Sequence, residues 1–179
     1  MRQEDAVPDA APPLIVTLAL DEDSHAFFQA QRRAYFPPAR DIVPAHLTLF
    51  HKLPGDLEAS VAATLAEAAA ARAPLAMSCS GVRFLGRGVA YAIESGALVA
   101  LRRALAARFA PWLGPQDRQG GPAHVTIQNK VAPHVAKALA ARLESGFVPF
   151  PVVGEGLLLW RYRGGPWEAA GRFPFAGAG

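Results

Sequence analysis

The sequence predicts one domain that combines α-helices with β-strands and contains an internal duplication. First, the chain of 179 residues is 51% hydrophobic, which is enough to bury a substantial core. Second, short apolar runs alternate with alanine-rich stretches of helical periodicity. Third, the order strand, helix, strand, helix, strand occurs twice. This layout fits parallel βαβ units as well as antiparallel sheets, so the residues alone leave the strand direction open.

The first copy spans residues 14–85 and opens with an apolar run at residues 14–20, which predicts a strand. Asp21 is a good N-cap for the helix that follows, and this helix ends near Tyr35 because two prolines come directly after Phe36. The other predicted elements of this copy are a strand at residues 45–50, a helix that is capped by Asp56 and ends before Pro74, and a strand at residues 75–85.

The second copy spans residues 88–153 and follows the same order. Ser95 caps its first helix, and Gly146 follows its second helix, where glycine is favoured. Its predicted elements are a strand at residues 89–93, a helix at 96–109, a loop at 112–122, a strand at 123–128, a helix at 133–144 and an extended segment at 147–153. A hairpin at residues 156–174 completes a two-lobed domain of residues 14–174, and residues 1–13 are predicted as a flexible tail.

Composition and charge exclude several classes of protein. No apolar run approaches the roughly 20 residues that cross a bilayer, and the polar N-terminus lacks the apolar segment of a secretory signal. The single Cys79 cannot form an intrachain disulfide, so we expect a cytoplasmic protein with no membrane partner. The net charge is +3, and residues 91–179 carry ten basic and five acidic residues. This half could bind an anion, or its arginines could be scattered over a solvated surface.

The same tetrad stands at the middle strand of each copy. The first is His46-Leu47-Thr48-Leu49, the second is His124-Val125-Thr126-Ile127, and each follows a Pro-Ala pair. In a strand, residues two apart point to the same face, so each histidine projects together with its threonine. The chain has five histidines and four threonines, so two such pairs at matching points of a duplicated layout are improbable by chance.

Two imidazoles and two hydroxyls suit the opening of a cyclic phosphodiester. In-line attack at phosphorus needs a base beside the incoming oxygen and an acid beside the leaving oxygen, and histidine can serve as either near neutral pH. Threonine hydroxyls can donate hydrogen bonds to the non-bridging oxygens. This chemistry requires no metal and no other cofactor.

On these tetrads the chain resembles the two-histidine (2H) phosphoesterase superfamily, and more narrowly the bacterial 2′-5′ RNA ligase family. The resemblance covers most of residues 14–174. Beyond the tetrads, the stretches that support it are residues 35–38, 44–54, 84–91, 116–117 and 124–131. It implies a bilobal α+β fold in which two antiparallel β-sheets face each other across a central cleft, with helices on the outside.

The resemblance also implies what the site does. Family members open 2′,3′-cyclic phosphates at RNA ends or in related nucleotides, and some form 2′-5′ bonds in reverse. By position, His46 and His124 are the catalytic pair, and Thr48 and Thr126 hold the phosphate. We assign water activation to His124 and protonation of the leaving oxygen to His46, although the pseudo-symmetry makes these roles easy to exchange.

Strand alternation adds residues that could bind the substrate. It extends the cleft face four and six positions beyond each histidine and turns His51 away from the cleft if its strand stays regular. An arginine between aromatic residues in the last hairpin and a tyrosine before the first motif are further candidates. The predicted substrate-binding residues are Phe50, Lys52, Gln128, Lys130, Arg161 and Tyr35. Equally, the two lysines could be surface charges and Phe50 a core residue.

Two other function classes remain open. A non-catalytic module that binds RNA ends or nucleotides would use the same cleft, and the basic second half favours it. A metal centre would use His46, His51 and His124, but no carboxylate or cysteine lies beside them at ligand spacing. Because the duplication supplies both sides of the cleft, the sequence predicts a monomer.

Overall fold

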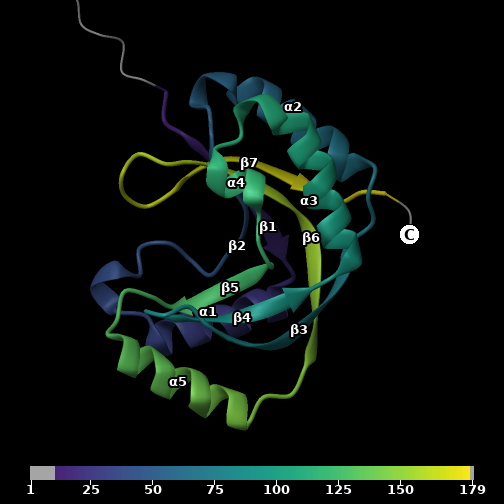
Figure 1. Ribbon diagram of the computed structural model, residues 1–179. Coiled ribbons are helices and arrows are strands. Elements are labelled where there is room, and N and C mark those ends of the chain that lie inside the picture. The colour runs from purple at the N-terminus through teal and green to yellow at the C-terminus, as the bar shows by residue number, and fades with distance from the viewer. Residues whose placement is uncertain (1–10, 178–179) are drawn as a thin grey trace, which may run out of the picture.

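The computed structural model describes residues 11–177 and combines seven strands with five α-helices over that range (Figure 1). Residues 1–10 of the predicted N-terminal tail lie outside it. The strands are β1 (Leu14–Leu20), β2 (Leu47–Leu53), β3 (Leu75–Phe84), β4 (Val89–Glu94), β5 (His124–Gln128), β6 (Phe150–Arg161) and β7 (Glu168–Pro174). The helices are α1 (Glu22–Tyr35), α2 (Glu58–Ala70), α3 (Gly96–Phe109), α4 (Pro115–Gln119) and α5 (Pro133–Ser145).

All strand pairs are antiparallel, which confirms the α+β class. The order is β2-β1-β6-β3-β4-β5, with β7 also paired to β6. The two predicted sheets are therefore two halves of one hydrogen-bonded sheet, β2-β1-β6-β7 and β6-β3-β4-β5. They share β6, whose first part pairs with β3 and whose second part lies between β1 and β7.

The continuity of β6 corrects the predicted break between an extended segment and a separate hairpin. Gly154 and Gly156 lie inside the strand and make no turn. A Cβ atom on Gly156 would come within 2.5 Å of the Phe173 carbonyl oxygen, and one on Gly154 within 2.9 Å of a Leu18 methyl carbon. These glycines therefore allow neighbouring groups to approach the strand closely. The turn of the predicted hairpin lies between β6 and β7, where Gly164 has a φ angle of 88°.

Both half-sheets carry helices, and α3 contacts β3 as well as α2. Helices α2 and α3 pack on each other, and α2 contacts β6 and β7, whereas α1 packs on β5 and α5 on β3 and β4 (Figure 1). Helix α1 precedes the first motif in sequence but covers the half-sheet that holds the second. Each half-sheet thus uses elements from both sequence copies, and one buried apolar cluster runs through both.

Two of the predicted helix caps are confirmed. The side chain of Asp21 accepts a hydrogen bond from the Ser24 N–H, and that of Ser95 accepts one from the Leu98 N–H. The prediction for Asp56 is wrong, because a short 3-10 turn (Gly55–Leu57) precedes α2 and the helix begins at Glu58. The predicted loop at residues 112–122 contains α4.

Among the described residues, no helix has the length and apolar character needed to cross a membrane.

Candidate active site

The two motifs meet at one cavity of about 820 Å³, and His46, Thr48, His124 and Thr126 all line it. His46 lies directly before β2 and His124 begins β5. These strands stand at opposite ends of the strand order, yet they contact each other, so the curved sheet brings its two ends together. Antiparallel pairing to β1 and β4, respectively, fixes each motif in the same orientation toward its half-sheet.

Both histidine rings are held in the same way. Nδ1 of His46 lies 2.7 Å from the carbonyl oxygen of Pro44, and Nδ1 of His124 lies 3.0 Å from that of Pro122. Because a carbonyl oxygen only accepts, each Nδ1 carries a proton and donates it. The other ring nitrogen, Nε2, is then the atom that can exchange a proton with a bound molecule. The repeated Pro-Ala pair before each motif supplies this carbonyl.

Burial lowers the pKa of His46 to about 4, and the positive charges of Arg32, His124 and His51 act in the same direction. The hydrogen bond to Pro44 opposes the shift but does not overcome it. His46 is therefore neutral at pH 7, with a lone pair on Nε2.

Trp167, at the end of the β6–β7 turn, covers His46. The two ring centroids lie 4.6 Å apart with planes inclined by 52°. Trp160 packs beside Trp167, at 6.0 Å between ring centroids, and its indole N–H donates to the Thr17 hydroxyl at 3.0 Å. The last hairpin thus contributes an aromatic wall, through Trp167, to the cavity that both motifs line.

Arg32 on α1 connects the segment before the first motif with the strand of the second. Its side chain is 2% exposed, and Nε and Nη2 donate to Oδ1 of Asp41 at 2.9 and 2.8 Å. Nη1 donates to the carbonyl oxygen of Thr126 at 3.1 Å. Asp41 belongs to the segment that leads into His46, so one guanidinium connects the approach to the first motif with the strand of the second.

We expect Arg32→Met to lower the free energy of unfolding by about 3 kcal/mol, because it leaves the Asp41 carboxylate without its buried partner. Urea denaturation followed by circular dichroism measures this effect. The matched control is Arg33→Met on the exposed side of α1, which should change the unfolding free energy by less than about 0.5 kcal/mol. Equal stability of the two variants would contradict the connecting role of Arg32.

A β-bulge in each motif strand changes which residues face the cavity. The pairing of β2 with β1 slips by one residue between Thr48 and Phe50, and that of β5 with β4 slips between Thr126 and Gln128. The extra residue reverses the alternation beyond it. Phe50 and Gln128 are consequently buried, which corrects their predicted place on the cleft face. His51 and Asn129, one position further along in each copy, line the cavity instead.

The other predicted substrate-binding residues also lie outside the cavity lining. Lys52 and Lys130 are exposed at the ends of their motif strands. Arg161 forms ion pairs with Glu58 and Glu168, which occupy its guanidinium. Tyr35 packs against the core with the Arg142 guanidinium carbon 5.3 Å from its ring centroid. The structure therefore brings together the four motif residues and none of the six predicted to bind substrate.

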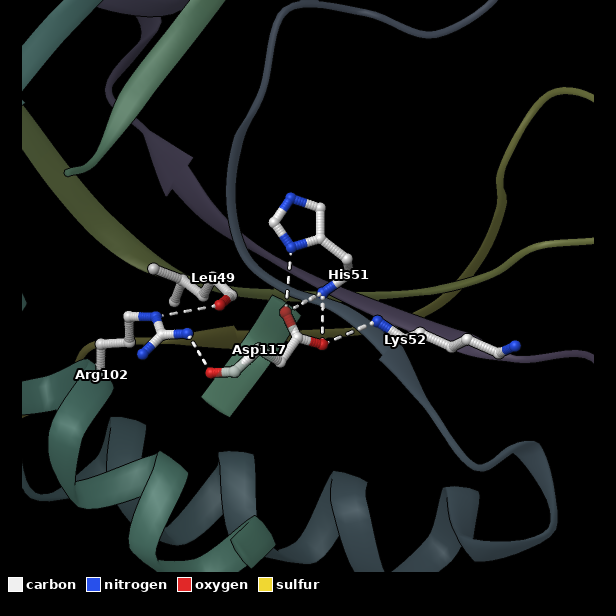
Figure 2. Close-up of polar contacts among 5 residues, drawn as sticks. All are labelled: Leu49, His51, Lys52, Arg102 and Asp117. Carbon is white, nitrogen blue, oxygen red and sulfur yellow. Dashed lines mark hydrogen bonds and ion pairs between the residues drawn. The ribbon is translucent and has the colours of Figure 1, made fainter. Parts of the chain in front are cut away.

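Asp117 on α4 holds the end of β2 in place (Figure 2). Its carboxylate accepts the His51 N–H at 3.0 Å, the Lys52 N–H at 3.1 Å and the His51 Nδ1 proton at 2.9 Å. Burial alone would raise the pKa of Asp117, but these hydrogen bonds lower it below its usual value. Arg102 on α3 donates to the carbonyl oxygens of Leu49 and Asp117, at 3.2 and 2.7 Å.

Sequence reasoning missed His51, Arg102 and Trp167 as cavity residues. One signal was present, because the Gln116-Asp117 pair is among the stretches that carry the family resemblance. Its partner on β2 could not be found from spacing, since 66 residues separate Asp117 from His51. Within residues 11–177, no three His, Cys, Asp or Glu side chains gather as metal ligands would.

Comparison with known proteins identifies the family. The sequence profile of the 2′-5′ RNA ligase superfamily matches residues 20–166. The chain belongs to the 2′-5′ RNA ligase superfamily. This superfamily belongs to the 2H phosphoesterases, and the match supports an enzyme of that class. A search of curated proteins finds no match.

Solved structures share the fold of this superfamily member. The crystal structure of TT0787 from Thermus thermophilus superimposes with a TM-score of 0.67 at 20% sequence identity, covering 93% of this chain and all of that one (100%). E. coli LigT complexed with NADP+ gives a TM-score of 0.58 at 15% identity, covering 92% of this chain and 98% of LigT. LigT complexed with 3′-AMP gives a TM-score of 0.56 at 17% identity, and the match again covers 92% of this chain and 98% of LigT.

Proposed function

We propose that the protein is a metal-independent phosphodiesterase that opens 2′,3′-cyclic phosphates at RNA ends or in related nucleotides. The observation that carries this proposal is the matched pair of imidazoles in one cavity, each of which donates its Nδ1 proton to the carbonyl oxygen two residues before it. This arrangement leaves two Nε2 atoms for proton transfer. Thr48 and Thr126, each two positions after one of the histidines, line the same cavity.

In the proposed reaction, neutral His46 accepts a proton from water on Nε2 while the water oxygen attacks phosphorus. His124, protonated on both ring nitrogens, donates its Nε2 proton to the ribose oxygen that leaves. One P–O bond forms and one breaks, and the Thr48 and Thr126 hydroxyls donate to the non-bridging oxygens. These roles reverse our sequence-based assignment, and the lowered pKa of His46 supports the reversal.

Three further features support a nucleotide substrate. The cavity lies within the size range of small-molecule sites, about 300–1,000 Å³. Among its charged lining residues are Arg83 and Arg102, with Glu94 as the one carboxylate in the lining of the described cavity. Among the related structures, LigT was crystallised with 3′-AMP, with ATP and with NADP+.

We also propose a cytoplasmic monomer, in keeping with the buried free thiol of Cys79 and with one chain supplying both motifs.

A substrate panel with EDTA present tests this function. The panel holds nucleoside 2′,3′-cyclic phosphates, RNA that ends in a cyclic phosphate, and 2′-5′-linked oligonucleotides. We expect turnover of a cyclic phosphate at the same rate with and without EDTA. Tight nucleotide binding without any turnover would instead support the alternative, a non-catalytic module, and a rate abolished by EDTA and restored by a metal would contradict the proposed chemistry.

The lowered pKa of His46 predicts the acid side of the pH–rate profile. A base must be neutral, so activity is lost as the pH falls through its pKa, and the acid limb of kcat/KM should lie near pH 4. Because Trp167 helps to bury His46, Trp167→Ala should move that limb toward neutral pH by about one unit. Trp112→Phe, away from the cavity lining, is the control. An acid limb at the same pH in wild type and Trp167→Ala would contradict this origin of the shift.

A further inference from the structure

One end of the cavity carries polar groups that the proposed reaction does not use. His51 and Arg102 both line the cavity, and both are held by Asp117 from different sides: His51 through the carboxylate and Arg102 through the carbonyl oxygen. Figure 2 shows the imidazole and the guanidinium approaching Asp117 from two directions. Two residues far apart in sequence thus both line the cavity and are both held by Asp117.

Each of the two side chains keeps a nitrogen for a ligand. Since Nδ1 of His51 donates to the Asp117 carboxylate, its Nε2 is the remaining ring nitrogen, and a proton on Nε2 would allow the ring to donate to an anion. Arg102 uses Nε and Nη2 for backbone carbonyls, which leaves Nη1. A Cβ atom at Gly120 would lie 2.9 Å from Nη1, so this glycine, with φ of 64°, lets the backbone pass close to the guanidinium.

This end of the cavity has no counterpart in the other copy. The β-bulges place His51 and Asn129 at equivalent positions, but asparagine is neutral and cannot become a cation. The two halves of the cavity are therefore pseudo-symmetric at the two motifs, where the reacting phosphate is expected. They differ at the positions of His51 and Asn129. Such a difference would fix the direction in which an asymmetric anionic substrate lies.

We propose that His51 and Arg102 form a second anion-binding subsite, which takes the phosphate on the 5′ side of the nucleoside whose 2′,3′-cyclic phosphate is opened. This inference rests on the proposed function and narrows its substrate class. The preferred substrate is an RNA end or a 5′-phosphorylated nucleotide, and a cyclic phosphate without a 5′-phosphate is a poorer one.

The test compares adenosine 2′,3′-cyclic phosphate with its 5′-phosphorylated form as substrates of the full chain. Wild type should favour the 5′-phosphorylated form by about tenfold in kcat/KM, the effect of one charge-assisted hydrogen bond. His51→Asn, which introduces the residue of the other copy, should reduce this ratio to about two or less. Lys52→Gln, which removes a neighbouring positive charge outside the cavity lining, should keep the ratio of wild type. Equal rates for the two substrates in wild type, or an unchanged ratio in His51→Asn, would overturn the subsite.

A binding measurement separates this inference from the proposed function. Adenosine 3′,5′-bisphosphate should bind wild type about tenfold more tightly than 3′-AMP by calorimetry, and His51→Asn should lose this difference. If neither cyclic substrate is hydrolysed but the difference in binding is found, the subsite holds and the phosphodiesterase proposal fails. If hydrolysis is found without any difference in rate or binding, the function holds and the subsite fails.

Discussion

His46→Ala and His124→Ala are each expected to lower kcat/KM for a 2′,3′-cyclic phosphate by about 10³-fold, within the range of about 10²–10⁴ that one general acid or base contributes. Each variant removes one of the two Nε2 atoms that the cavity offers for proton transfer. Steady-state kinetics at neutral pH, with EDTA present, measures the loss. The double variant should be little slower than the slower single variant, because the two groups act on the same step.

The control for this series is His134→Ala, since His134 is exposed on α5 and lies outside the cavity lining. It should retain the rate of wild type. Circular dichroism and the unfolding midpoint of each variant separate a loss of catalysis from a loss of fold. A catalytic rate within about threefold of wild type in either His46→Ala or His124→Ala would contradict acid–base catalysis by that residue.

Thr48→Val and Thr126→Val are expected to lower kcat by about 10²-fold each, the effect of removing one hydrogen-bond donor to charge that develops in the transition state. Valine keeps the shape of threonine and its preference for a strand, so β2 and β5 should be preserved. Because the hydroxyl contributes most in the transition state, KM should change less than kcat.

Two further variants test the hydroxyl itself. Thr48→Ser keeps the donor and should retain most of the activity. Thr64→Val removes a buried hydroxyl on α2, outside the cavity lining, and should leave kcat unchanged. If Thr48→Val kept the activity of wild type while Thr48→Ser lost it, the methyl group of threonine, and not its hydroxyl, would be the part that matters.

The sequence predicted the elements whose signals are local. The run at residues 14–20 forms β1 with those bounds, and α1 follows with Asp21 as its cap, because apolar spacing and a capping carboxylate act within a few residues. That the two motifs share one site was predictable for a different reason. A repeated His-x-Thr at matching points of a duplicated chain indicates a shared site even when the strand direction is open.

The errors arose where tertiary contacts decide the structure. Strand alternation placed Phe50 and Gln128 on the cleft face, and a one-residue bulge in each strand removed them from it. The residues near His51 in sequence do not indicate that its side chain and backbone N–H will donate hydrogen bonds to Asp117. Likewise, Gly154 and Gly156 resemble a turn in sequence, and only the close approach of Leu18 and Phe173 shows why a continuous strand needs them.

The exchange of helices between the half-sheets has the same origin. Helix α1 carries Arg32, which reaches the strand of the second motif although the helix precedes the first. This contact could not be predicted by treating the chain as two self-contained copies. The pattern of polar and apolar residues in a helix does not show which half-sheet the helix covers. The connection between the motifs therefore became visible only in the fold.

The most direct test of the two-histidine chemistry is hydrolysis of a 2′,3′-cyclic phosphate whose leaving ribose oxygen is replaced by sulfur. Thiolate leaves without a proton, so this substrate needs the base but not the acid. We predict that sulfur restores His124→Ala to within about tenfold of wild type and leaves His46→Ala inactive. Restoration of His46→Ala instead would exchange the two roles, and restoration of neither variant would contradict two-histidine acid–base catalysis in this cavity.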